Sequence, residues 1–190
     1  GAQVDTRWPQ HSMDRPQPTV VTPGRYGAEG RPSDAISLFD GKDLSAWRDT
    51  ANAPARWVVK DGYFQVAPGA GMIHTARAFG DVQLHIEWSA PTPPVGESQE
   101  RGNSGVFLMR HYEIQVLDTY HNLTYADGMA GAVYGQTPPL VNASRGPGQW
   151  QTYDIVFHRP RFDAKGAVTR PAHVTVLHNG VLVQDNTEIT

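Results

Sequence analysis

Apolar and polar residues alternate with a period of two along much of this chain, and this feature constrains its fold more than any other. The segment 82–88, VQLHIEW, places Val, Leu, Ile and Trp on one face and Gln, His and Glu on the other. Residues 112–117, YEIQVL, repeat the pattern. Such alternation indicates half-buried strands, and no stretch has helical periodicity beyond about one turn. We therefore predict an all-β fold, a two-sheet antiparallel sandwich.

Turn sequences separate the predicted strands. Asp61-Gly62 and Asn179-Gly180 supply the positive φ angles of tight hairpin turns. The predicted hairpins join residues 57–60 to 63–66, 103–108 to 112–117, and 172–177 to 181–183. Residues 151–157 add a further strand. Two long connections, 91–102 and 119–149, remain, and compact domains seldom keep loops of that length without a function.

The 190 residues suffice for one domain with a full core. Residues 1–33 are rich in Pro, Gly and Arg, which predicts an extended or flexible N-terminal arm ahead of a sandwich domain over 34–190. A net charge of −3 without any basic run argues against a nucleic-acid partner. No apolar stretch approaches the length of a membrane span. Without cysteine, the chain can form neither a disulfide nor a cysteine-based zinc site.

Polar residues of two strands suggest a shared site. Gln83, His85 and Glu87 alternate along one strand, and Glu113 and Gln115 along another, with His111 just before it. An ordinary solvated face gives the same alternation, but these residue types lack Lys and offer proton transfer near neutral pH. We expect the two sets to share one sheet face. His85, Glu87, His111 and Glu113 could also bind a divalent metal ion.

The second long loop carries side chains suited to sugar recognition. Tyr120, Tyr125, Tyr134, Asn142 and Arg145 lie in it. Aromatic rings stack on pyranose faces, and amides bond hydroxyl groups. A carbohydrate is therefore the expected ligand.

Five segments together resemble the 3-keto-disaccharide hydrolase domain family. They are LFDGKDLSAW, FGDVQLHIEW, GNSGVFLMRHYEIQVLD, PGQWQTYDIVF and VTVLHNGVLVQ, in family order over residues 36–190. NSGVFL followed by YEIQVLD is the most specific part. The resemblance implies a concanavalin- or laminin-G-like jelly roll, exported to the periplasm or cell exterior, that cleaves glycosides with a ketone at C3 and binds them on its concave face. The Gly1-Ala2 start agrees with a processed, exported chain.

Family domains continue through a Gly-Pro turn into closing strands, whereas this sequence stops at Thr190. We expect the domain to lack these closing strands, so that an open sheet edge near residues 174–183 is covered by the arm or by self-association.

The family's substrate implies a mechanism. A C3 ketone acidifies the C2 hydrogen, so that elimination of the C1 substituent followed by hydration gives net hydrolysis. We predict His111 or His85 as the base and Glu113 or Glu87 as the acid or as the group that activates water. The predicted substrate-binding residues are Asn103, Gln115, Asp118, Tyr134, Asn142 and Arg145. The alternatives are a glycosidase that uses Glu87 and Glu113 as two carboxylates, a non-catalytic carbohydrate-binding module, and a structural or interaction domain.

Overall fold

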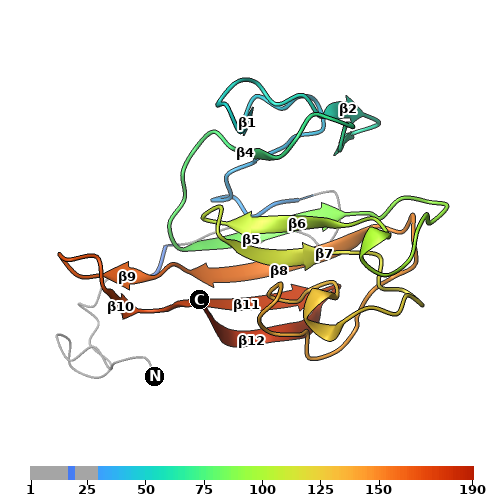
Figure 1. Ribbon diagram of the computed structural model, residues 1–190. Coiled ribbons are helices and arrows are strands. Elements are labelled where there is room, and N and C mark those ends of the chain that lie inside the picture. Colours follow the sequence, from blue (N-terminus) through green and yellow to red (C-terminus); the bar gives the residue numbers. More distant parts are fainter. Residues whose placement is uncertain (1–16, 20–29) are drawn as a thin grey trace. The chain divides into compact units, whose positions relative to one another are not determined.

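The structure, a computed structural model, describes residues 17–19 and 30–190 (Figure 1). Most of the predicted arm, residues 1–33, lies outside these described residues. The chain divides into two compact units, residues 1–77 and 78–190, and each is described by itself.

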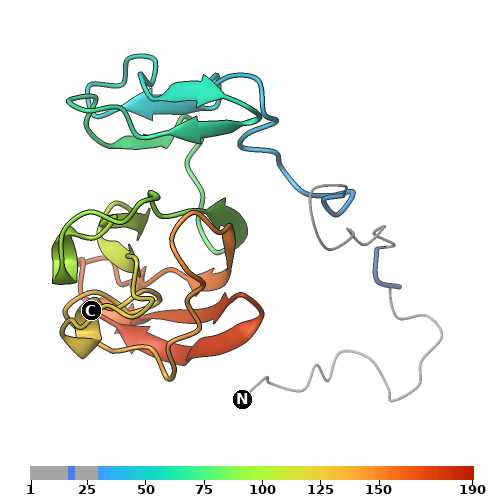
Figure 2. The same cartoon turned by 90° about the vertical axis from the view of Figure 1, so that its right-hand side faces the viewer.

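The first unit contains four short strands in two antiparallel pairs (Figure 2). They are β1 (Trp47–Asp49), β2 (Val58–Lys60), β3 (Tyr63–Gln65) and β4 (Ile73–Thr75). The β2–β3 hairpin turns at Asp61 and Gly62, both with positive φ, as the Asp-Gly sequence predicts. An aromatic cluster holds the unit together, since the Phe64 ring lies within 6 Å of the rings of Phe39, Trp47 and Trp57.

The second unit contains a four-stranded antiparallel sheet in the order β12-β11-β8-β5. Its strands are β5 (Val82–Trp88), β8 (Gln151–His158), β11 (Ala172–His178) and β12 (Val181–Ile189). Beside it lie the pair β6 (Ser104–Leu108) and β7 (Tyr112–Val116) and the short pair β9 (Arg161–Phe162) and β10 (Val168–Arg170). The 3-10 turns are η1 (Ser98–Glu100) and η2 (Ala126–Gly128), and residues 17–19 and 30–190 contain no α-helix.

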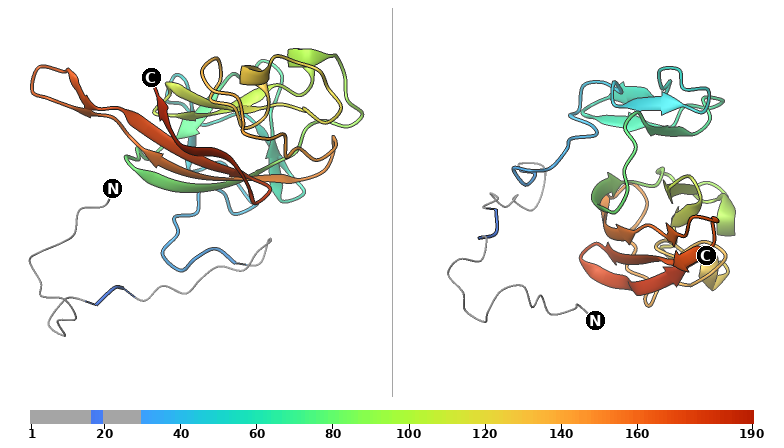
Figure 3. Two further views of the ribbon diagram at one scale, coloured as in Figure 1. Left: turned by 90° about the horizontal axis from the view of Figure 1, so that it is seen from below. Right: turned by 90° about the vertical axis from the view of Figure 1, so that its left-hand side faces the viewer.

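The β6–β7 pair packs face to face on the four-stranded sheet (Figure 3). The core between them is formed by the inward residues of both layers: Trp88, Leu108, Tyr112, Ile114, Val116, Tyr153, Ile155, Phe157, Val174 and Val176. The Tyr153 hydroxyl crosses this core and donates to the Gln115 carbonyl at 2.6 Å. The predicted all-β, jelly-roll-type sandwich is confirmed.

The sandwich has two outer faces, and this corrects the prediction of one shared polar face. β5 belongs to the four-stranded sheet and β7 to the other layer. Leu84 and Ile86 point into the core from one side, and Ile114 from the other. The residues that alternate with them therefore point in opposite directions, so His85 and Glu87 lie on one outer face and Glu113 on the other. The prediction was wrong because alternation shows which side chains of a strand face the core but does not show which sheet contains the strand.

The long loop 119–149 packs on both layers. Residues 131–134 run beside β7 through a bridge between Ile114 and Val133. The Leu140 amide donates to the Val183 carbonyl at 2.9 Å, and the Thr190 amide to Gln136 Oε1 at 3.0 Å. The loop thus covers parts of the β12 edge, while self-association remains a prediction. Among the described residues, no helix is long and apolar enough to cross a membrane.

Candidate functional site

A glutamate lies between two aromatic residues on the outer face of β6 and β7. Phe107 of β6 is the direct cross-strand partner of Glu113. On the other side, the Tyr134 amide donates to the Glu113 carbonyl at 3.0 Å, next to the Ile114–Val133 bridge. Directly opposed residues of paired strands project to the same face. Phe107, Glu113 and Tyr134 therefore form one row, and the two rings remain 41% and 38% exposed.

The Glu113 side chain folds down over Gly105. A Cβ atom at position 105 would lie 2.7 Å from the Glu113 carboxyl carbon, and closer still to one of its oxygens. Gly105 is thus needed for space and not for its backbone angle. Burial raises the pKa of Glu113 above its ordinary value, because desolvation disfavours the charged carboxylate. This shift favours the acid form.

Gln115 forms the next row of the same face and is almost fully buried. A network of amides orients its side chain. Gln99 Nε2 donates to the Gly128 carbonyl at 3.0 Å, so Gln99 Oε1 must act as an acceptor, and Gln115 Nε2 donates to it at 3.0 Å. Asn103 Nδ2 likewise donates to the Gln99 carbonyl at 2.9 Å, which leaves Asn103 Oδ1 as an acceptor for Gln115. The network therefore assigns Gln115 Nε2 as the donor atom.

The Gln115 Oε1 atom is consequently a buried acceptor, and it has no hydrogen-bond partner among the described residues. A buried acceptor without a donor is costly, on the order of 1–3 kcal/mol. Gly105 is the cross-strand partner of Gln115, and the Glu113 carboxyl lies above Gly105. Glu113 and Gln115 therefore occupy alternate positions on the same face of β7.

His111 lies in the turn between β6 and β7, two residues before Glu113. The turn is tight, since Met109 and Arg110 both have positive φ and the His111 amide donates to the Leu108 carbonyl at 3.1 Å. Its ring is exposed and meets the Tyr112 ring edge-on at 4.8 Å between centroids. His111 thus lies just before β7, two positions ahead of Glu113 along the chain.

His85 and Glu87 lie on the outer face of the four-stranded sheet. His85 Nδ1 is 2.7 Å from the Asp154 carboxylate, its cross-strand partner. Because the core separates Glu87 from Glu113, the two carboxylates cannot flank one glycosidic bond. The structure therefore does not form the predicted two-carboxylate pair. The predicted four-residue metal site is not assembled either. Indeed, the described part of the chain has no cluster of three His, Asp or Glu side chains suited to a metal ion.

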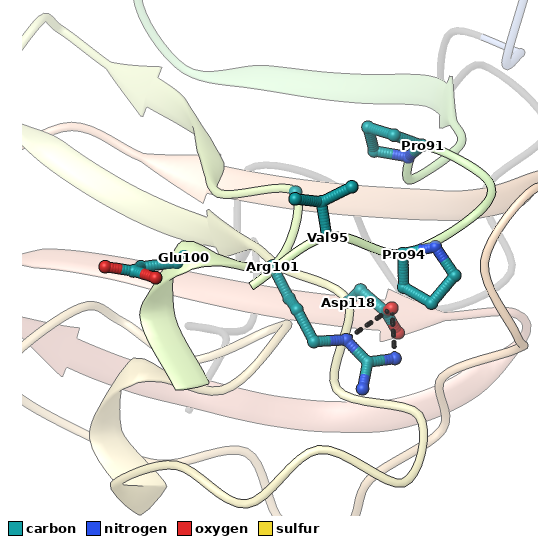
Figure 4. A pocket seen from close by; sticks show the side chains of 7 residues that line it. Pro91, Pro94, Val95, Glu100, Arg101 and Asp118 are labelled. Atoms are coloured by element: carbon teal, nitrogen blue, oxygen red, sulfur yellow. Dashed lines mark hydrogen bonds and ion pairs between the residues drawn. The ribbon is translucent and has the colours of Figure 1, made fainter. Parts of the chain in front are cut away.

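Asp118 is buried in an ion pair. Arg101 Nε donates to its carboxylate at 3.0 Å and Arg101 Nη2 at 2.5 Å, while the Tyr120 amide donates to the other oxygen. The pair borders a small cavity of about 170 Å³, lined also by Pro91, Pro94, Val95, Glu100 and Gly102 (Figure 4). These bonds give Asp118 a structural role that orders the 91–102 loop.

Asn142 and Arg145 are also engaged within the loop. Asn142 Nδ2 donates to the Thr119 carbonyl at 2.9 Å, and its Oδ1 accepts from Thr119 and Ser144. Arg145 Nη1 donates to the Trp150 carbonyl at 2.9 Å. The structure thus brings Asn103, Glu113, Gln115 and Tyr134 together, with His111 close by in sequence.

Sequence reasoning missed two residues of this face. Phe107 could have been found, because residues 103, 105 and 107 alternate in the same way as 113 and 115. Gln99 had no such signal, since it lies in a loop whose path only the fold defines.

An all-β sandwich that carries a half-buried carboxyl group and exposed aromatic residues on one face has the kind of surface that suits a sugar ligand. Comparison with known proteins agrees: the chain belongs to the family of 3-keto-alpha-glucoside-1,2-lyase-like domains, whose model matches residues 34–190. A crystal structure from Parabacteroides distasonis, of a protein provisionally named a glycosyl hydrolase, is 49% identical with a TM-score of 0.90, and the match covers 94% of this chain and 77% of that one. Another Parabacteroides distasonis protein with the same provisional name is 19% identical with a TM-score of 0.53, over 80% of this chain and 72% of that one, and shows the fold alone. No curated protein matches the chain.

Proposed function

We propose that this domain cleaves 3-keto glycosides by elimination and hydration, with Glu113 as the acid on the outer face of β6 and β7. The observation that carries the proposal is the half-buried Glu113, whose pKa burial raises and whose backbone lies in one row with Phe107 and Tyr134, in a chain of this family. Raised carboxyl pKa values are typical of groups that act as acids near neutral pH.

The proposed reaction uses the residues in separate roles. A base, for which His111 is the candidate on this face, takes the proton from C2, and the C–H electron pair forms a C2–C3 double bond as the C3 oxygen becomes an enolate oxyanion. The enolate then restores the C3 ketone, forms a C1–C2 double bond and breaks the bond between C1 and the leaving oxygen. Glu113 gives its proton to that oxygen. Water adds back as hydroxyl at C1 and a proton at C2.

The test compares a 3-keto-α-glucoside with its unoxidised parent, using the full chain in deuterated water. We expect the 3-keto compound to be cleaved and the unoxidised parent not to be, and the product should carry deuterium at C2. A control without enzyme measures spontaneous exchange. Glu113→Gln should slow cleavage by roughly 10²–10⁴-fold. Glu87→Gln, on the opposite outer face, is the matched control and should cleave as the native chain does.

The other outcomes contradict the proposal in distinct ways. Cleavage with C2 fully protiated would favour direct displacement at C1. Binding of the glycoside without turnover would make the domain a carbohydrate-binding module. An equal effect of the two glutamate substitutions would remove Glu113 from the acid role.

A further inference from the structure

Two tyrosine hydroxyl groups of the 119–149 loop form a short hydrogen bond, and one of these residues, Tyr134, has its backbone paired with Glu113. The Tyr125 and Tyr134 oxygens are 2.6 Å apart, and the rings meet edge-on at 6.3 Å between centroids. Both rings are exposed to solvent, Tyr125 by 48%. Ordering two exposed phenol side chains in one contact has an entropic cost. The position of the pair relative to Glu113 therefore bears on its function.

Tyr134 reaches this position through the sheet. Its backbone is paired with that of Glu113, and Val133, the preceding residue, is fully buried against the core. Alternation therefore turns the Tyr134 ring to the outer face on which Glu113 lies.

The Tyr125 ring packs directly against the backbone of Gly128. A Cβ atom at position 128 would lie 2.6 Å from the Tyr125 ring carbon Cδ2 and 2.9 Å from Gln99 Nε2. The ring therefore rests directly on the backbone, next to the amide network that orients Gln115. Both members of the pair are thus fixed by the elements that form the site.

In a pair of phenols, one hydroxyl donates and the other accepts, and the accepting hydroxyl keeps its own proton for a third group. The 2.6 Å geometry allows either hydroxyl to donate. Tyr134 is the member whose backbone is paired with that of Glu113, and its own proton is left for a third group in the arrangement in which Tyr125 donates. Tyr134 then has the unused O–H. A donor that itself accepts a hydrogen bond is strengthened by it.

We propose that Tyr134 donates this hydrogen bond to the C3 oxygen of a 3-keto glycoside and is a catalytic residue, with Tyr125 as the residue that positions it. The inference rests on the proposed function. When the base removes the C2 proton, the carbonyl electron pair moves onto the C3 oxygen, and a fixed donor stabilises the charge that develops there. No proton is transferred from Tyr134, so the enolate returns its electron pair when the C1 bond breaks.

The experiment measures C2 hydrogen exchange and cleavage of the 3-keto-α-glucoside in deuterated water for Tyr134→Phe, Tyr125→Phe and the double variant. Tyr63→Phe, which removes a phenol hydroxyl of β3 outside this loop, is the matched control. Tyr134→Phe should lower kcat and the exchange rate together by roughly 10²–10³-fold with little change in KM, as for loss of one oxyanion donor. Tyr125→Phe should have a smaller effect. The double variant should resemble Tyr134→Phe, because the two residues act as a unit.

The controls separate the two proposals. Thermal unfolding of each variant identifies loss of fold, which would lower cleavage in proportion to the folded fraction. If the native chain exchanges C2 and cleaves while Tyr134→Phe does both at the native rate, the tyrosine assignment is overturned and the proposed function stands. If the native chain shows neither exchange nor cleavage, both are overturned. A rise in KM alone would make the pair a binding contact and would also overturn the catalytic role.

Discussion

At the scale of single residues, the site depends on a missing side chain. Gly105 has no Cβ, and the space this leaves is filled by the Glu113 carboxyl. We predict that Gly105→Ala displaces this carboxyl and lowers kcat/KM for a 3-keto glycoside by roughly 10²-fold, since misplacement of about 1 Å can cost that much. Gly146→Ala is the matched control, because its Cβ would find only ordinary contacts at 3.6 Å or more. Full activity of Gly105→Ala with an unchanged melting temperature would show that the carboxyl position does not matter.

At the scale of elements, the buried side-chain amide of Gln184 joins the loop that carries Tyr134 to β12. Gln184 Nε2 of β12 donates to the carbonyls of Gly131, Thr137 and Pro138 at 3.1, 3.3 and 3.1 Å. We predict that Gln184→Met removes this amide donor from the three carbonyls and lowers the free energy of unfolding by about 1–3 kcal/mol. Amide hydrogen exchange should increase within residues 131–137. Gln136→Ala, an exposed amide that bonds Thr190, is the control and should cost less than about 1 kcal/mol. Equal losses from both substitutions would contradict a special role for Gln184.

The strands and hairpins also show which features could be predicted from sequence. Period-two alternation and the turn dipeptides predicted the β2–β3 and β6–β7 hairpins and the β5 strand, because side-chain direction and turn geometry are local properties. The same rule predicted that the Glu113 and Gln115 side chains project to the face of β7 opposite Ile114. The partner sheet of each strand is a long-range property, and so His85 and Glu87 were grouped with the wrong layer. Gln99 and the tyrosine pair depend on loop paths that no local pattern describes.

At the scale of the whole molecule, a buried histidine links stability to pH. His178 is fully buried at the end of β11, with Nε2 2.8 Å from Gln151 Oε1 and its ring stacked on Trp88. Burial, with a smaller contribution from the charge of Arg145, lowers the pKa of His178 from 6.5 to about 4. The folded chain therefore holds this imidazole neutral at pH values where the unfolded chain already protonates it. Its contribution to stability is complete above about pH 6.5 and decreases as the pH falls toward 4.

We predict that the free energy of unfolding falls by up to about 3 kcal/mol between pH 6.5 and pH 4 because of His178 alone, on top of the change due to other groups. His178→Gln keeps an amide donor near the position of Nε2 but cannot be protonated, so its stability should be lower than native at neutral pH and fall less steeply with acid. Urea unfolding at half-unit pH steps measures both curves. His121→Gln, which removes an exposed histidine of the 119–149 loop, should keep the native slope. If the slopes of the native chain and His178→Gln are the same over this range, His178 is not the buried group that titrates.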